Sequence, residues 1–283
     1  MIWFGPAGNS ESFYAQGYDH SWQMPEWLKK MGLNAYEYQC NKGVNLKEDT
    51  ARKIGEAAQE NGIRLSIHAP YYINLSSTEP EKRKNSIRYL MESLQAAKWM
   101  GASRVVFHPG YVSGITRATA VEMAKDTLLN AIEEADGRAF GDVTLCPEVL
   151  GKSNQLGNLE EVMSLCDLDK RLIPCVDFGH VHALTRGGMN TEEDYRKILQ
   201  IVGEALGPDR LKKLHIHFSR VEFDKHGEKK HWGLSDTQYG PEFEPLARVL
   251  SDMNMEPVII CESRQNMAED ALTLKGIYQG LTE

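Results

Sequence analysis

The sequence predicts an α/β fold, a (β/α)8 TIM barrel made by residues 1–283 as a single domain, and two observations predict it. Eight short runs rich in β-branched and aromatic residues alternate with longer stretches of helical period, the pattern of parallel βα units. No proline- or serine-rich linker divides the 283 residues, and eight βα units of this length match the roughly 250 residues typical of such a barrel. A doubly wound open sheet is the competing architecture.

The predicted strands are short apolar runs bounded by polar or turn-forming residues. In chain order they are Ile2–Gly5, Ala35–Cys40, Arg64–His68, Arg104–His108, Val143–Glu148, Ile173–Asp177, Lys213–Phe218 and Pro257–Glu262. The clearest helices between them are Lys47–Asn61, Glu81–Met100, Thr119–Ala135, Glu192–Ala205 and Glu242–Met253. In the first helix, a narrow apolar stripe would pack on a sheet, and Gly62 supplies a glycine stop; the stripe is Ala51, Ile54, Ala57 and Ala58.

Composition and charge exclude several classes of protein. A hydrophobic share of 41% and a charged share of 25% exclude disordered, collagen-like and coiled-coil chains. No apolar run approaches the ~18 residues of a membrane span, and the amino terminus lacks a signal-peptide pattern, so we expect a cytoplasmic protein with no membrane partner. The five cysteines form no C-x-x-C pair, so we expect buried free thiols. A net charge of −8 argues against loose electrostatic binding to polyanions unless bound cations offset it.

Side chains that can bind metals stand at the carboxyl ends of six successive predicted strands. They are His68, His108, Glu148, Asp177 with His180, His215 with His217, and Glu262. In a barrel these ends meet at one rim, which carries the active site. A lone histidine there is more often structural, but a carboxylate ending an apolar run costs on the order of several kcal/mol unless it is paired or metal-bound. Three such carboxylates at one rim would repel one another without a cation, so the joint pattern predicts a metal centre.

Two details of this predicted centre stay open. His215 and His217 are two residues apart on one strand and face the same way, so one would ligate at the rim while the other lies a layer deeper. The sequence does not decide between them. The mixed nitrogen and oxygen ligands suit Zn²⁺, with Mn²⁺ and Fe²⁺ as alternatives.

Four motifs resemble the signatures of the endonuclease IV family (AP endonuclease family 2), which lies within the xylose isomerase-like TIM barrel superfamily. They are His68-Ala69-Pro70-Tyr71-Tyr72-Ile73-Asn74-Leu75, Phe107-His108-Pro109-Gly110, Pro147-Glu148 followed by Asn154-Gln155-Leu156-Gly157, and Asp177-Phe178-Gly179-His180. The resemblance implies a zinc-dependent hydrolase with up to three ions. It also implies a substrate, double-stranded DNA containing abasic sites, which the enzyme cleaves 5′ to the lesion in base excision repair. We expect a monomer.

The resemblance also implies a role for each residue. The first zinc would be bound by His68 and His108, with Glu148 bridging to the second and orienting the attacking water. The second zinc would add Asp177, Glu262 and the histidine of the seventh strand, and the third would take His180. The remaining ligands of the third zinc are either Glu228 with His231 or Asp224 with His226. Tyr71 would contact DNA by entering the gap where a base is missing.

Basic side chains in the predicted loops of the same rim could contact DNA phosphates. They are Lys42, Lys152, Arg186, Arg220, Lys225, Lys229 and Lys230. Each of them taken alone also fits an ordinary solvated surface residue.

The paired histidines at His215 and His217 support an alternative within the same superfamily, a sugar isomerase or epimerase. Such an enzyme would hold one divalent metal, and a carboxylate would move a proton next to a carbonyl group; its ligands would be Glu148, Asp177, His217 and Glu262. It would not need His68, His108, His180 or His231 as ligands. A binding protein that kept the barrel without the chemistry is a second alternative.

Overall fold

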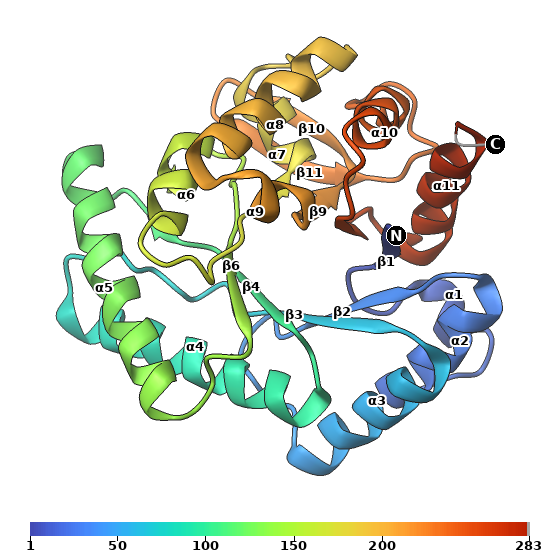
Figure 1. Cartoon of the computed structure of the whole chain (residues 1–283), viewed down its shortest axis with the longest axis horizontal. Coiled ribbons are helices and arrows are strands. Elements are labelled where there is room, and N and C mark those ends of the chain that lie inside the picture. Colours follow the sequence, from blue (N-terminus) through green and yellow to red (C-terminus); the bar gives the residue numbers. More distant parts are fainter. Residues whose placement is uncertain (282–283) are drawn as a thin grey trace.

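Eight parallel strands form a closed barrel within residues 1–281, the part of the chain that the computed structural model describes (Figure 1). The barrel strands are β1 (Trp3–Pro6), β2 (Ala35–Gln39), β3 (Arg64–His68), β4 (Arg104–Phe107), β6 (Thr144–Pro147), β8 (Cys175–Asp177), β9 (His215–Phe218) and β12 (Val258–Cys261). They form two sheets, β1-β12-β9-β8 and β2-β3-β4-β6. Parallel bridges from Ala7 to Glu37 and from Glu148 to Cys175 join the two sheets at both seams. The predicted (β/α)8 barrel is confirmed, and the open sheet is excluded.

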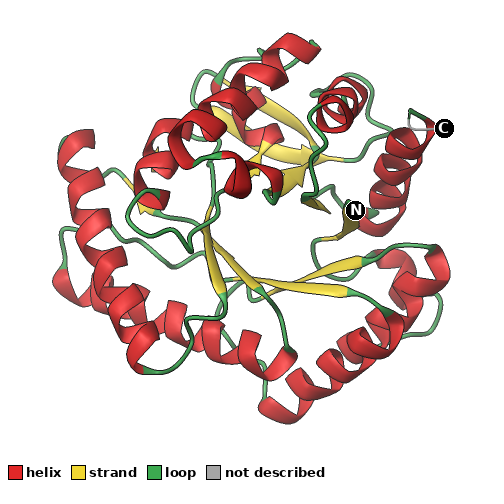
Figure 2. Ribbon diagram, in the orientation of Figure 1, coloured by secondary structure: helices red, strands yellow, loops and turns green. Residues whose placement is uncertain are grey.

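Helices cover the outside of this ring (Figure 2). They are α1 (Glu11–Ala15), α2 (Met24–Met31), α3 (Glu48–Asn61), α4 (Pro80–Met100), α5 (Arg117–Gly137), α6 (Leu159–Cys166), α7 (Phe178–Leu184), α8 (Glu192–Leu206), α9 (Pro208–Lys212), α10 (Phe243–Asp252) and α11 (Met267–Gly280), with a 3-10 turn at Ser21–Gln23. Each predicted strand and helix lies within about two residues of its expected bounds. The last helix, α11, packs on β1 and closes the ring of helices.

Local sequence accounts for the way α3 meets the barrel. Ala51, Ile54 and Ala58 are buried, as the apolar stripe predicts, whereas Ala57 is half-buried. The helix ends at Gly62, which has a left-handed φ of +67° that costs glycine little. Only two residues separate Asn61, the end of the helix, from β3, so the helix end fixes where that strand begins.

Two short antiparallel pairs lie outside the barrel, in loops that follow the carboxyl ends of strands. One joins β5 (Gly110–Tyr111) to β7 (Gln155–Leu156), and the other is a hairpin of β10 (Arg220–Asp224) and β11 (Gly227–Trp232). The hairpin packs against α7. The strand pattern did not predict these pairs, because they are too short or too polar to show apolar alternation.

All five cysteines are buried free thiols, as predicted. Among residues 1–281, no helix has the length and apolar character needed to cross a membrane.

Candidate metal centre

The carboxyl ends of the barrel strands bring the predicted ligands to one mouth. His68 is the last residue of β3, and Asp177 is the last residue of β8. Asp177 pairs in register with His217 of the neighbouring strand β9. Glu148 and Glu262 directly follow β6 and β12. The parallel register of the barrel therefore places side chains from distant parts of the sequence at the same level.

Three groups of ligand-type side chains form at this mouth, and within each group the ligand atoms lie within 4.8 Å of one another. The first group is His68, His108 and Glu148; the second is Glu148, Asp177, His217 and Glu262; the third is His180, Glu228 and His231. The first two groups share Glu148. Its Oε2 lies 3.0 Å from Nε2 of His68 and 3.2 Å from Nε2 of His108, and its Oε1 lies 3.6 Å from Nδ1 of His217.

The third group contains Glu228 and His231 rather than Asp224 and His226. Asp224 and His226 are exposed at the turn of the hairpin. A bulge after Glu222 shifts the register of the hairpin, and the two residues of β11 face His180. Ser219 Oγ lies 2.7 Å from Nδ1 of His231, so the hydroxyl fixes the orientation of that ring and leaves Nε2 available to a ligand.

The structure also separates the two histidines of β9. His217 joins the carboxylate group, with Nδ1 3.4 Å from Oε1 of Glu262. His215 lies a layer deeper and is fully buried, with Nε2 2.9 Å from Oε2 of Glu37. His215 belongs to a different cluster, formed with His217 and Cys175.

Burial and charge act in opposite directions on the ionisable groups. Burial lowers the pKa of His68, but the hydrogen bond to Glu148 and the charges of nearby carboxylates outweigh it and raise that pKa to about 9. Burial also opposes the charge of His180, yet Asp177 and Glu148 raise its pKa to about 10. Burial raises the pKa of Glu148, but the neighbouring histidines hold it well below its usual value. Protonated histidines therefore balance the carboxylates at neutral pH, and a bound cation would displace these protons.

The side chains of the second group fit a divalent metal. Oε1 of Glu148, Oδ2 of Asp177 and Nδ1 of His217 are buried and have no hydrogen-bond partner among the described residues. A buried polar atom without a partner costs about 1–3 kcal/mol, and a cation would satisfy all three atoms at once. Imidazole and carboxylate donors together suit Zn²⁺, and also Mn²⁺ or Fe²⁺.

Glu37, a fully buried residue of β2, was not among the predicted site residues. Its carboxylate accepts hydrogen bonds from Ser66 at 2.8 Å and from Gln39 at 3.1 Å. A signal was present, because Glu37 is a single carboxylate within the run Ala35-Tyr36-Glu37-Tyr38. Burial of a carboxylate in this run carries the same desolvation cost as burial of Glu148 or Glu262.

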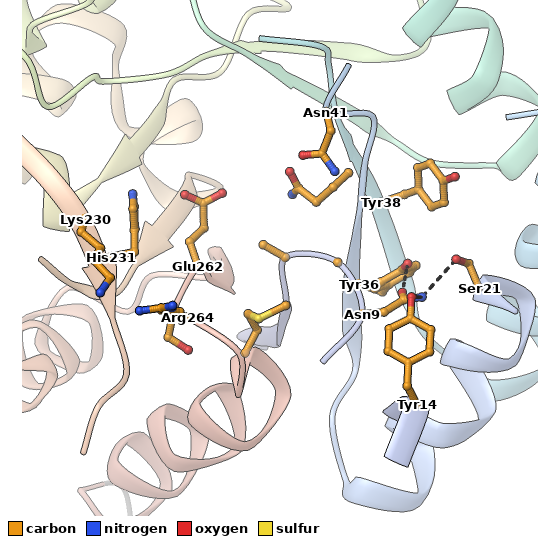
Figure 3. Close-up of a pocket in the computed structure, with 15 residues that line it drawn as sticks. Asn9, Tyr14, Ser21, Tyr36, Tyr38, Asn41, Lys230, His231, Glu262 and Arg264 are labelled. Carbon is orange, nitrogen blue, oxygen red and sulfur yellow. Dashed lines mark hydrogen bonds between the residues drawn. The ribbon is translucent and has the colours of Figure 1, made fainter. Parts of the chain in front are cut away.

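A cleft of about 640 Å³ opens beside the candidate metal ligands His231 and Glu262 (Figure 3). On the side of those two ligands, Lys230 and Arg264 give the cleft a basic wall. The facing wall is neutral and held by hydrogen bonds: Asn9 bonds the side chains of Tyr14, Ser21 and Tyr36 at 2.7–3.2 Å. A smaller cavity of about 310 Å³ lies over the centre itself and shares His231 and Glu262 with the cleft, so one ligand can occupy both.

Tyr71 and Lys152 line the smaller cavity, as expected of rim residues. The tyrosine is 39% exposed, and Lys152 Nζ lies 3.2 Å from Oε2 of Glu228. The expectation that Arg220 could contact a substrate is wrong. Arg220 is buried, and its guanidinium donates to the backbone of Tyr239 and pairs with Glu242, so it stabilises the hairpin instead.

Two curated relatives are similar over much of the chain. An uncharacterized protein of Methanocaldococcus jannaschii is 33% identical over 281 residues, covering 99% of this chain and 98% of that protein. A protein of Acholeplasma laidlawii named probable endonuclease 4 is 30% identical over 209 residues, covering 67% of this chain and 69% of that protein. The sequence resemblance to endonuclease IV is thus confirmed.

Solved structures share the fold. The crystal structure of endonuclease IV from Thermus thermophilus superposes with a TM-score of 0.68 at 21% identity, covering 93% of this chain and 94% of that one. A D-tagatose 3-epimerase-like protein superposes with a TM-score of 0.66 at 18% identity, covering 88% of each chain. A family model described as xylose isomerase-like TIM barrel matches residues 25–277. The chain therefore belongs to the xylose isomerase-like TIM barrel family.

Proposed function

We propose that this protein is a zinc-dependent phosphodiesterase that cleaves double-stranded DNA 5′ to abasic sites. The observation that carries the proposal is that three ligand groups share one mouth and two of them share Glu148. A single-metal enzyme would have no use for the first and third groups. The relative named probable endonuclease 4 supports the same activity.

Each residue of the mouth has a role in this proposal. His68, His108 and Glu148 would hold one ion; Glu148, Asp177, His217 and Glu262 a second; His180, Glu228 and His231 a third. Bound zinc would supply a Lewis acid that activates water near neutral pH and offsets charge on the leaving oxygen. Glu148, located between the first two groups, would orient the attacking water as the catalytic carboxylate.

The surroundings of the centre would bind the DNA. Lys152 in the smaller cavity, with Lys230 and Arg264 in the cleft, offers positive charge for phosphates on either side of the scissile bond. Tyr71 is exposed at the same mouth, where its ring could stack in the gap left by a missing base. The divalent ions would offset much of the net charge of −8, which otherwise disfavours DNA binding.

The experiment that tests this proposal combines metal analysis with an incision assay on protein purified without chelator. We expect about three zinc ions per chain and a single cut 5′ to a synthetic abasic site in duplex DNA. Chelation should abolish the cut, and added zinc should restore it. An intact duplex after incubation with zinc-loaded protein would contradict the proposed activity.

A sugar isomerase or epimerase is the second candidate. The four residues that such an enzyme requires form one group, Glu148, Asp177, His217 and Glu262, and a cleft of about 640 Å³ is large enough for a sugar. This candidate predicts one Mn²⁺ or Mg²⁺ ion per chain and conversion of ketose substrates. The same metal analysis therefore separates the two candidates.

A further inference from the structure

A second polar layer lies inside the barrel directly beneath the metal centre. Glu37 of β2 and His215 of β9 are fully buried, and Arg104 of β4 is 3% exposed. Arg104 donates hydrogen bonds to the backbone oxygens of Lys213 and Leu214, and its Nη1 lies 3.4 Å from Nδ1 of His215. An arginine cannot accept a hydrogen bond, so Nδ1 of His215 is the acceptor, and Nε2 carries the proton that faces Glu37.

The carboxylate of Glu37 is surrounded by donors. Its Oε2 accepts a hydrogen bond from Ser66 and lies 2.9 Å from Nε2 of His215. Its Oε1 accepts one from Gln39 and lies 3.1 Å from Nε2 of His217. The two imidazole contacts are short, but they are charge–dipole contacts and not hydrogen bonds, because the N–H groups do not point straight at the oxygens. Two hydrogen bonds and two close imidazole contacts thus hold one negative charge at a fixed position in the core.

His217 connects this layer to the mouth because its two ring nitrogens face different partners. Nε2 faces Glu37 at 3.1 Å, whereas Nδ1 lies 3.4 Å from Glu262 and 3.6 Å from Glu148. In a neutral imidazole, one nitrogen carries the proton and the other has the lone pair that binds a metal. A negative charge beside Nε2 favours the proton on that nitrogen and leaves the lone pair of Nδ1 facing the mouth.

We propose that Glu37 is a positioning residue that fixes the tautomer and the orientation of His217 for metal binding. The inference rests on the proposed metal centre but does not depend on whether the substrate is DNA or a sugar. Carboxylates that hold the second nitrogen of a ligating histidine raise its basicity as a ligand, and losing one typically weakens metal binding by about 10–100-fold.

The deeper layer also contains Cys175, which forms a cluster of ligand-type atoms with His215 and His217. Because Glu37 contacts both of these histidines, the alternative role for it is to help bind a further ion in the deeper layer. Both oxygens of Glu37 are already engaged by Ser66 and Gln39, and the Arg104 guanidinium lies next to His215. Both features favour a positioning role for Glu37 over a further ion in this layer.

The test measures zinc affinity of the full-length protein by competition with a chromophoric chelator. Glu37→Gln removes the charge and keeps the shape, and we expect the affinity of the most affected site to fall about 10–100-fold. Glu37→Asp keeps the charge but moves it away from His217, so its zinc affinity should fall less than that of Glu37→Gln. Cys146→Ser, at a buried thiol of β6 that belongs to none of the ligand clusters, is the matched control and should bind zinc as the unaltered protein does. Thermal unfolding of each chelated variant shows whether the barrel remains folded.

The visible spectrum of the cobalt-substituted protein gives a second measurement. It would not change if Glu37 served only to stabilise the fold. In folded protein loaded with Co²⁺, Glu37→Gln should shift the visible ligand-field bands, and Cys146→Ser should not. Unchanged affinity and spectrum in Glu37→Gln would overturn this inference alone, whereas failure of the unaltered protein to bind metal would overturn the metal centre as well. A thiolate-to-cobalt band in the near ultraviolet that disappears in Cys175→Ser would place an ion in the deeper layer and also overturn the positioning role.

Discussion

The ligand groups at the mouth are built in two different ways. The candidate ligands of the first set, the strand-borne ligands, lie in the last two residues of a barrel strand or directly after it; they are His68, His108, Glu148, Asp177, His217 and Glu262. The hairpin-borne ligands are Glu228 and His231, which lie on β11 outside the barrel. The first set depends on the register of the whole barrel, in which Asp177 pairs with His217. The second depends on the local geometry of one loop.

The two sets are held in place by different kinds of contact. The hairpin bulges after Glu222, and its turn glycine, Gly227, has a φ of +109°. A Cβ on Gly227 would come within 2.0 Å of the backbone oxygen of Gly151, so a glycine is needed for the hairpin to dock. The strand-borne ligands, in contrast, are fixed by the barrel's hydrogen-bonded ladder and packed core.

The largest effect is expected in the strand-borne set, at the residue that two groups share. Glu148→Gln keeps the shape but removes the charge that the first two groups need. Losing a residue that only supports a ligand already lowers metal affinity or activity by about 10–100-fold. For the shared carboxylate itself we therefore expect the incision rate to fall by more than about 100-fold and the zinc content to drop. Glu222→Gln is the matched control, since this carboxylate pairs with Lys229 on the hairpin and belongs to none of the three groups. Equal activity of the two variants would refute the bridging role.

The next largest effect, on zinc content, is expected at the hairpin-borne ligands and not at their neighbours in the hairpin turn. Glu228→Gln should lower zinc content by about one ion per chain and leave the first two groups loaded. Asp224→Asn, four residues away and exposed, should leave all ions in place. Metal analysis of both variants after identical dialysis checks this. If Asp224→Asn loses the ion instead, the hairpin rearranges when metal binds and the register seen here is not the working one.

A moderate effect of pH on thermal stability is expected, and it should differ between zinc-loaded and metal-free protein. The pKa of His68 is about 9, raised from an ordinary 6.5, so the stability it contributes is complete below pH 6.5 and is lost as the pH rises through 9. His180, with a pKa of about 10, acts in the same direction. Zinc needs the unprotonated rings, so it should compensate this loss. The difference in Tm between zinc-loaded and chelated protein should widen from pH 6.5 to 9, and a constant difference would contradict the assigned charges.

The same division explains how much the sequence could predict. Apolar runs and helical periodicity located the eight barrel strands, because parallel strands in a barrel are buried and short. Residues at their ends therefore met where expected, as His68 and Asp177 do. The choice between Glu228 and Asp224 depended on the bulge after Glu222, and nothing in the residue pattern marks a bulge.

The deeper layer was missed for a different reason. Glu37 lies in the middle of β2, not at its end, so the pattern of ligand-type residues at strand ends does not include it. Ser66 and His215, which contact Glu37, and Arg104, which contacts His215, come from three other strands. Such a network depends on which residues face the barrel interior at the same level, and that alignment requires the barrel's strand register as well as the sequence.

The smallest effect is expected at Lys152, which lies next to the hairpin-borne ligands without being a ligand. Its ammonium group is 3.2 Å from Glu228 and its side chain is 44% exposed, so the ion pair itself contributes little. Lys152→Ala should therefore keep the full zinc content and weaken DNA binding a few-fold. The slope of log affinity against log salt concentration should become shallower by about 1, as expected for one lost phosphate contact. Lys197→Ala on the outer helix α8 is the control and should change neither. An unchanged salt slope in Lys152→Ala would mean that the DNA does not pass over this side of the mouth. The DNA backbone would then have to follow the basic wall of the cleft, at Lys230 and Arg264.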